Sequence, residues 1–331
     1  MKPTPDLHHL RGVVPARCLL GIGVLLAGSL SVDLFAGSLP ASHGAHDRYS
    51  GRQGQIIVVK VPTDDAATTV QGTFLGRSIR FFPDPRLDEL KGFVGLLGID
   101  LQDEPGMHEL MVELKTAEQS RMLRYSISIV KEKFHVEHLT LPKDKVDLNE
   151  KNLARWKAEQ EQVKAALATE SQSKLWQPDF VEPVSGRRTG IFGSVRIMNG
   201  QARNPHNGED IGAPLGTAVA ATNDGVVRLT VDHIFSGKGV FLDHGLGFYS
   251  MYFHLSEVLV KDGEQVKAGQ IVGKVGATGR ATGPHLHWGV KLNGARVNPY
   301  ALLDLPFKGA VQSAAPSPVT QPASDVGSPA P

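Results

Sequence analysis

The chain has 331 residues, which is long enough for two domains. Its 35 lysine and arginine residues are balanced by 34 aspartate and glutamate residues and form no basic cluster, so the composition argues against a nucleic-acid partner. Cys18 is the only cysteine, which excludes an intramolecular disulfide bond.

The N-terminus has the pattern of a secretory signal. An apolar run from Cys18 to Val32 follows Arg11 and Arg17, and it is shorter than the roughly 20 residues that a membrane-spanning helix needs. Residues 1–38 are therefore predicted to be a signal peptide, with an uncleaved anchor as the alternative. Either outcome predicts a periplasmic or extracellular protein, and cleavage would leave no stable membrane span.

Residues 52–141 are predicted to form a β-domain. The segment Leu123–Ile129 alternates apolar and polar residues, and Ile56–Val61 is a β-branched run. Short strands over this length predict an immunoglobulin-like β-sandwich. No group of polar residues in it suggests catalysis, so we expect a targeting or regulatory domain, with a passive spacer as the alternative.

Residues 147–176 are predicted to form a linker helix. The segment Asp147–Glu150 resembles a capping box, and apolar residues recur near helical spacing in a segment that is otherwise charged or polar. These apolar residues are Leu153, Trp156, Val163 and Leu167. We expect the helix to pack one stripe on a domain; a coil with another protein is the alternative.

Residues 184–307 are rich in glycine and in short apolar runs. The segment Asn223–Gly225 lies between two such runs, 218–221 and 226–229, and predicts a hairpin. Closely spaced strands predict an antiparallel sheet folded into an open groove. The remaining segment, 308–331, is rich in proline, alanine and serine and is predicted to be a disordered tail.

Histidine and aspartate residues in this last domain have a pattern suited to metal chemistry. His206 and Asp210 lie in one segment, His285 and His287 in another, and His254 between them. Two imidazoles and one carboxylate are the ligand set of a catalytic zinc, which keeps a fourth position for water. Side chains two residues apart on a strand share a face, so one histidine of the His-x-His pair can bind the metal while the other reaches the water. A pair of half-exposed histidines with no ligand role is the alternative.

Three motifs follow one another in a fixed order, separated by glycine-rich turns. They are His206-Asn207-Gly208-Glu209-Asp210, Tyr252-Phe253-His254-Leu255-Ser256 and Thr282-Gly283-Pro284-His285-Leu286-His287. With these motifs, the segment from about Gly190 to Leu303 resembles the LytM/lysostaphin-type zinc endopeptidases, which cut the peptide bridges of bacterial peptidoglycan.

The resemblance implies that His206, Asp210 and His287 bind one zinc ion per chain and that His254 and His285 are the catalytic pair. Histidine titrates in the range that a general base needs, and the second imidazole can stabilise the transition state. Which histidine has which role is left open. Some family members have a tyrosine shortly before the first ligand; residues 199–205 contain none, so the identity of the oxyanion donor is also open.

The remaining polar residues of interest are expected to have structural or surface positions. We expect a structural role for His244, and surface positions for His108, His135, His138 and His233. Glu209 is next to a predicted ligand on a strand, so it should face away from the metal and be solvated.

The sequence therefore predicts a secreted zinc endopeptidase that acts on peptidoglycan stem peptides. The order of domains resembles periplasmic members in Gram-negative bacteria, which implies D-alanyl–diaminopimelate bonds as the target. The alternatives are a zinc-free activator of another hydrolase, a lipoyl-type carrier and an endopeptidase acting on proteins. The presence of all three ligands argues against the first, and the second requires a lysine that the turn Asp243–Gly245 lacks. A regulatory protein partner and the oligomeric state are left open.

Overall fold

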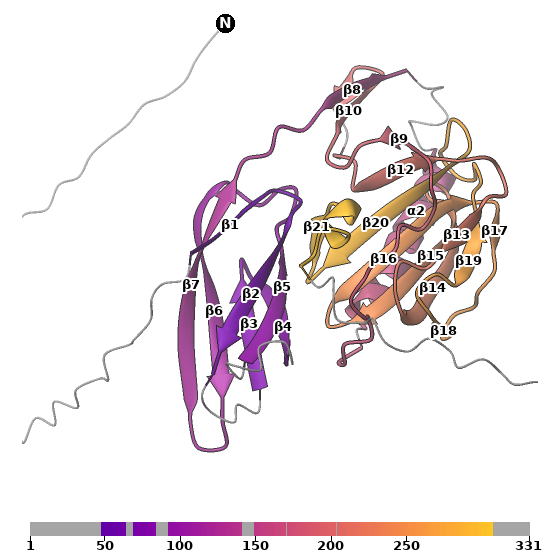
Figure 1. The fold of residues 1–331 in the computed structure, drawn as a ribbon. Coiled ribbons are helices and arrows are strands. Elements are labelled where there is room, and N and C mark those ends of the chain that lie inside the picture. Colours follow the sequence, from indigo (N-terminus) through magenta and orange to yellow (C-terminus); the bar gives the residue numbers. More distant parts are fainter. Residues whose placement is uncertain are drawn as a thin grey trace, which may run out of the picture. The chain divides into compact units, whose positions relative to one another are not determined.

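The computed structural model describes residues 48–63, 69–83, 92–140, 149–169, 171–202 and 204–306. These residues form mainly β-strands with one α-helix (Figure 1), which confirms the predicted fold class at this level. The predicted signal peptide and the predicted tail lie outside the described residues. Within the described ranges, no helix is both long enough and apolar enough to cross a membrane.

The first seven strands form one continuous ladder in the order β1-β7-β6-β3-β4-β5-β2. Their bounds are β1 Arg48–Arg52, β2 Ile56–Pro62, β3 Thr69–Phe74, β4 Arg77–Pro83, β5 Gly92–Gly98, β6 Gly106–Lys115 and β7 Ser120–Val130. Alternate residues of these strands point inward and form a buried core that includes Phe74, Ile79, Leu110 and Ile127. The expected immunoglobulin-like sandwich is not confirmed, because β4 pairs with β3 at one end and with β5 at the other and so joins the two halves.

The next strand belongs to a different sheet from the one its sequence position suggests. Strand β8 (Val136–Leu139) pairs in parallel with β10 (Val195–Met198), which in turn pairs with β11 (Gln201–Ala202). Residues 136–139 were expected at the end of the N-terminal β-domain. They instead join a small three-stranded sheet with a segment that directly precedes His206.

The predicted helix is present but shorter than expected. Helix α2 spans Glu150–Ala168, and its N-cap is Asn149, whose side chain accepts a hydrogen bond from the Asn152 N–H at 2.9 Å. Residues 171–176 are not helical. An apolar stripe of the helix, Val163, Ala166 and Leu167, packs on the buried side chains of Leu229, Val231 and Phe241. The helix was expected to pack one stripe on a domain, and here that stripe lies on strands β14 (Gly225–His233) and β15 (Gly237–Gly245).

The segment that contains the candidate ligands forms an eight-stranded sheet with the order β18-β14-β15-β16-β20-β12-β9, and β21 pairs with β20. The bounds are β9 Arg187–Gly190, β12 Gly208–Gly212, β14 Gly225–His233, β15 Gly237–Gly245, β16 Phe248–Leu255, β18 Gln265–Val266, β20 His285–Leu292 and β21 Ala295–Val297. A second sheet contains β13 Ala218–Ala220, β19 Ile271–Lys274 and β17 Glu257–Val258, and a 3-10 helix, η2, spans Pro299–Leu302.

The predicted hairpin around Asn223–Gly225 is wrong. Strand β13 pairs with β19, whereas β14 pairs with β15 and β18. The turn residues bind other segments instead: the Asn223 side chain bonds to both backbone groups of Gln177, and Asp224 accepts the Ala268 N–H at 2.8 Å. These contacts hold the two strands in different sheets.

Candidate active site

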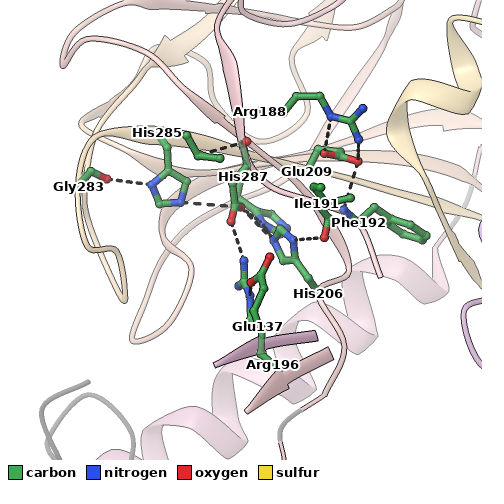
Figure 2. Close-up of polar contacts among 12 residues, drawn as sticks. Glu137, Arg188, Ile191, Phe192, Arg196, His206, Glu209, Gly283, His285 and His287 are labelled. Carbon is green, nitrogen blue, oxygen red and sulfur yellow. Dashed lines mark hydrogen bonds and ion pairs between the residues drawn. The ribbon is translucent and has the colours of Figure 1, made fainter. Parts of the chain in front are cut away.

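Two neighbouring antiparallel strands bring the candidate residues together. Strands β12 and β20 pair so that Asp210 lies directly opposite His287, and side chains in such a pair share a face of the sheet. Strand β16 lies on the other side of β20, with Phe253 opposite His287, and its next residue is His254. His206 lies just before β12. All five predicted site residues therefore come from the same part of the sheet, and Figure 2 shows His206, His285 and His287 there.

Three of them converge as metal ligands would. The Nε2 of His206 and the Nδ1 of His287 lie 3.0 Å and 2.9 Å from Oδ1 of Asp210, and 3.0 Å from each other. Zinc bonds of about 2.0–2.1 Å in tetrahedral geometry would separate ligand atoms by roughly 3.3 Å, which is close to these distances. All three residues are buried, at 4%, 8% and 7% exposure. The donor set and its spacing fit zinc.

The proton positions support the same conclusion. The Nδ1 of His206 lies 3.1 Å from the carbonyl oxygen of Ile191, and only a protonated nitrogen can bond to a carbonyl. In the neutral ring this leaves the lone pair on Nε2, which faces the carboxylate of Asp210 at 3.0 Å. That tautomer suits a metal ligand. Metal-binding histidines commonly donate their other N–H to a backbone carbonyl in this way.

Asp210 is held in its charged form. Burial alone would raise the pKa of Asp210, but the imidazoles of His206 and His287 outweigh this effect and lower it below its usual range. Its second oxygen, Oδ2, accepts a hydrogen bond from Nη2 of Arg196 at 2.8 Å. Burial lowers the pKa of His287, so this imidazole is neutral and can offer a lone pair.

His254 and His285 lie side by side, with ring centroids 4.7 Å apart. The Nδ1 of His254 bonds to the carbonyl of Thr278 at 2.8 Å, and the Nδ1 of His285 to the carbonyl of Gly283 at 2.9 Å. In both rings the Nε2 is therefore the nitrogen free to exchange a proton. The Nε2 of His285 lies 3.8 Å from Oδ1 of Asp210. Burial, and then the nearby His287, lower the pKa of His254 to about 3, so this ring is neutral near pH 7.

The backbone of His254 adopts an unusual conformation. Its φ is +62°, in the left-handed region that residues with a side chain rarely adopt, at a cost of about 1–3 kcal/mol. The surroundings hold it there: its N–H donates to the Ser236 carbonyl at 2.9 Å. Thr278, its side-chain partner, is itself anchored, since its hydroxyl bonds to the Leu255 carbonyl at 2.8 Å.

Gly208 of the His-x-Gly-x-Asp motif is required by close packing. A Cβ at this position would lie 2.6 Å from Nε2 of His287 and 2.5 Å from the carbonyl oxygen of Trp288. We expect Gly208→Ala to displace His287 and to lower zinc occupancy, measured as zinc per chain after dialysis. Gly283→Ala is the matched control, because a Cβ there meets nothing within 4 Å. Full zinc occupancy in Gly208→Ala would contradict this packing argument.

Glu209 is not solvated as expected. It faces away from Asp210, but it is fully buried, because β12 is an interior strand covered on both faces. Its carboxylate forms an ion pair with Arg188 and accepts the Phe192 N–H at 3.2 Å (Figure 2). His233 is also buried rather than on the surface, with its Nε2 3.2 Å from the Gln162 side chain.

Sequence reasoning missed two residues of the site, Arg196 and Glu137. Arg196 bonds to the outer oxygen of Asp210, and Glu137 bonds to the Nε of Arg196 at 3.2 Å. Neither lies in a motif or at a periodic spacing from Asp210. The pairing of β8 with β10 brings Glu137 beside Arg196, which itself reaches Asp210 from β10.

His244 has a structural position, in the interior and outside the ligand cluster. It is fully buried, and its ring nitrogens bond to the Asp224 carbonyl at 2.6 Å and the Ser250 hydroxyl at 2.7 Å. Burial lowers the pKa of His244 to about 4, whereas an unfolded histidine has a pKa of about 6.5. The unfolded chain therefore binds this proton first as the pH falls. The stability that depends on neutral His244 is complete above about pH 6.5 and is lost toward pH 4, by about 3 kcal/mol in all.

Acid should therefore destabilise the wild type more than a variant without this imidazole. Between pH 7.5 and pH 5, urea unfolding should show a loss of unfolding free energy about 2 kcal/mol larger in the wild type than in His244→Gln. Because the loss is measured within each protein, any pH-independent change in unfolding free energy caused by the substitution cancels. Equal losses in the two proteins would show that His244 does not titrate as its burial implies.

Comparisons with known proteins place this geometry in a family. A profile of Peptidase family M23 matches residues 204–299, which contain all five site residues. The peptidoglycan DD-endopeptidase ShyA of Vibrio cholerae is 47% identical over 94 residues, which are 28% of this chain and 22% of ShyA. The DD-carboxypeptidase/endopeptidase Mpg of Neisseria meningitidis is 41% identical over 97 residues, 29% of this chain and 22% of Mpg. The matched segment thus spans about a fifth of each curated relative.

A solved structure extends the likeness beyond this segment. A crystal structure from Pseudomonas aeruginosa, assigned to peptidase M23, is 32% identical and aligns over 74% of this chain and 92% of that one, with a TM-score of 0.58. The similarity therefore covers most of the fold as well as the motifs. With the converging ligands and the matched segment around them, the chain belongs to peptidase family M23, a family of metallopeptidases.

Proposed function

We propose that this protein is a secreted zinc endopeptidase that hydrolyses the peptide cross-links of bacterial peptidoglycan, with the D-alanyl–diaminopimelate bond as its target. His206, Asp210 and His287 hold one zinc ion, and His254 and His285 are the catalytic pair. The observation that carries the proposal is the convergence of three buried ligand atoms within 3.0 Å of one another, beside the paired imidazoles of His254 and His285.

The residues of the chain divide the chemistry between them. Bound zinc supplies a Lewis acid that polarises a carbonyl and acidifies water. The two catalytic rings, each fixed by its Nδ1, turn their Nε2 atoms away from the backbone and toward the reacting groups. The neutral Nε2 of one ring accepts the proton of the attacking water and passes it to the leaving amine. The other ring is the transition-state stabiliser, and with a proton on its Nε2 it would donate to the oxyanion that develops on the scissile carbonyl.

The substrate and the cellular location rest on other support. ShyA is named a peptidoglycan DD-endopeptidase, and the name of Mpg includes an endopeptidase activity, which favours a peptidoglycan stem peptide as substrate here. Residues 1–38 direct the chain out of the cytoplasm and into the compartment that contains peptidoglycan. The basic and acidic residues are balanced, and this composition argues against a nucleic-acid partner.

The test uses the chain from Leu39 onward and isolated peptidoglycan cross-linked through diaminopimelate. Mass spectrometry of the released fragments should show fewer cross-linked dimers and more monomeric stem peptides, and a zinc chelator should prevent both changes. Asp210→Ala is the matched inactive control. Intact dimers after prolonged incubation with the zinc-loaded protein would contradict the proposal, and cleavage of casein instead would favour a peptidase that acts on proteins.

A further inference from the structure

Asp210 has two carboxylate oxygens in different surroundings. Oδ1 faces the histidine ligands, whereas Oδ2 accepts the hydrogen bond from Nη2 of Arg196 at 2.8 Å. The Nε of the same guanidinium bonds to Glu137 at 3.2 Å, so Arg196 lies between the two carboxylates (Figure 2). The three side chains are only 12–21% exposed, which limits competition from water.

The backbone is arranged to allow this chain of contacts. Strands β8 and β10 pair in parallel with Glu137 next to Arg196, so the two side chains lie on the same face. On the other side, Gly190 pairs with Asp210. A Cβ on Gly190 would lie 2.2 Å from Oδ2 of Asp210 and 2.9 Å from Nη2 of Arg196. The glycine therefore leaves the space that the arginine needs to reach the carboxylate.

A hydrogen bond at this oxygen has a chemical consequence for the metal. A carboxylate can bind a cation through one oxygen or through both, and a second metal bond would fill the position that a catalytic zinc keeps for water. A guanidinium bonded to Oδ2 competes with a second metal bond at this oxygen and fixes the rotation of the carboxylate. Outer partners of this kind typically change metal affinity or activity by about 10–100-fold when they are removed.

We propose that Arg196 is a positioning residue that keeps Asp210 a one-oxygen ligand of zinc and that Glu137, from the distant strand β8, holds Arg196 in place. This inference rests on the proposed function, because it concerns the same metal site. The proposal connects strand β8 to a ligand of the catalytic ion through the contacts of Glu137 with Arg196 and of Arg196 with Asp210. Strand β8 follows the N-terminal strands in the chain. Arg196 and Glu137 act through Asp210 and do not touch the substrate.

The test measures zinc affinity in the full chain by competition with a chromogenic chelator. Arg196→Met should weaken zinc binding about 10–100-fold, and Arg196→Lys, which keeps the charge and one donor, should be intermediate. The matched control is Arg228→Met: Arg228 is similarly exposed and forms an ion pair with buried Asp243, away from the ligands. It should bind zinc within threefold of wild type. Zinc affinity is read without a substrate, so a failure of the proposed peptidase activity would be seen separately.

A second readout reports the coordination itself. In cobalt-substituted protein, the intensity of visible absorption distinguishes four from five ligands, and Arg196→Met should shift toward five as Asp210 binds through both oxygens. Wild-type zinc affinity in Arg196→Met, or an equal loss in Arg228→Met, would overturn the proposal. If Arg196→Met yields no folded protein, Glu137→Gln decides the question: a loss of zinc affinity of about threefold or more supports the proposal, and wild-type affinity overturns it.

Discussion

Replacing His287 with alanine is expected to remove bound zinc and peptidase activity together. The His287 Nδ1 is one corner of a triangle of ligand atoms whose other corners are 2.9 Å and 3.0 Å away, so its loss leaves two protein ligands. The fall in zinc affinity should exceed the roughly 10–100-fold that follows loss of an outer partner, because a direct metal bond is lost. Metal analysis after dialysis should find less than one zinc per chain.

The same strand provides a matched comparison. His285 lies two residues away on β20 with its Nδ1 bonded to the Gly283 carbonyl, and its Nε2 is 3.8 Å from Asp210. His285→Ala should therefore keep its zinc, while His206→Ala and Asp210→Ala should lose it as His287→Ala does. Full zinc occupancy in all three ligand variants would overturn the assignment of the metal site. Circular dichroism of each variant separates metal loss from unfolding.

Substitution of either catalytic histidine is expected to abolish most turnover while zinc remains bound. General acid–base catalysis by a positioned side chain contributes about 10²–10⁴-fold, so kcat should fall by this factor in His254→Asn and in His285→Ala. Asparagine is the better replacement at His254, because it tolerates the left-handed backbone, with φ +62°, more readily than alanine. The losses should appear in kcat rather than in zinc content.

The double variant gives the sharper result. If the two histidines act in one proton-transfer step, His254→Asn with His285→Ala should lose little more activity than the more damaging single variant. Near-wild-type rates in both single variants would remove the pair from the mechanism. Multiplicative losses would show that the two imidazoles act in independent steps.

The sequence predicted the elements whose patterns are local. Strands β2 and β7 follow from a β-branched and an alternating run, and helix α2 from apolar residues at helical spacing. The N-cap of that helix is Asn149 rather than Asp147. The start of the helix is set by one hydrogen bond, from the Asn152 N–H to the Asn149 side chain. The hairpin at Asn223–Gly225 was mispredicted because its side chains bond to segments distant in sequence, and no local pattern carries that information.

For the histidines of the site, the sequence predicts the face of the strand but not the pairing partner of each residue. Alternation along a strand has a period of two, so His285-Leu286-His287 alone puts both imidazoles on one face of β20. Which of them faces Asp210 depends on the register of β12 against β20, and the pairing of Asp210 with His287 decides it. The Arg196–Glu137 contact likewise exists only because β8 pairs with β10. Residue types and local periodicity thus determined the chemistry of this site, whereas strand register, which long-range packing sets, decided which atoms meet.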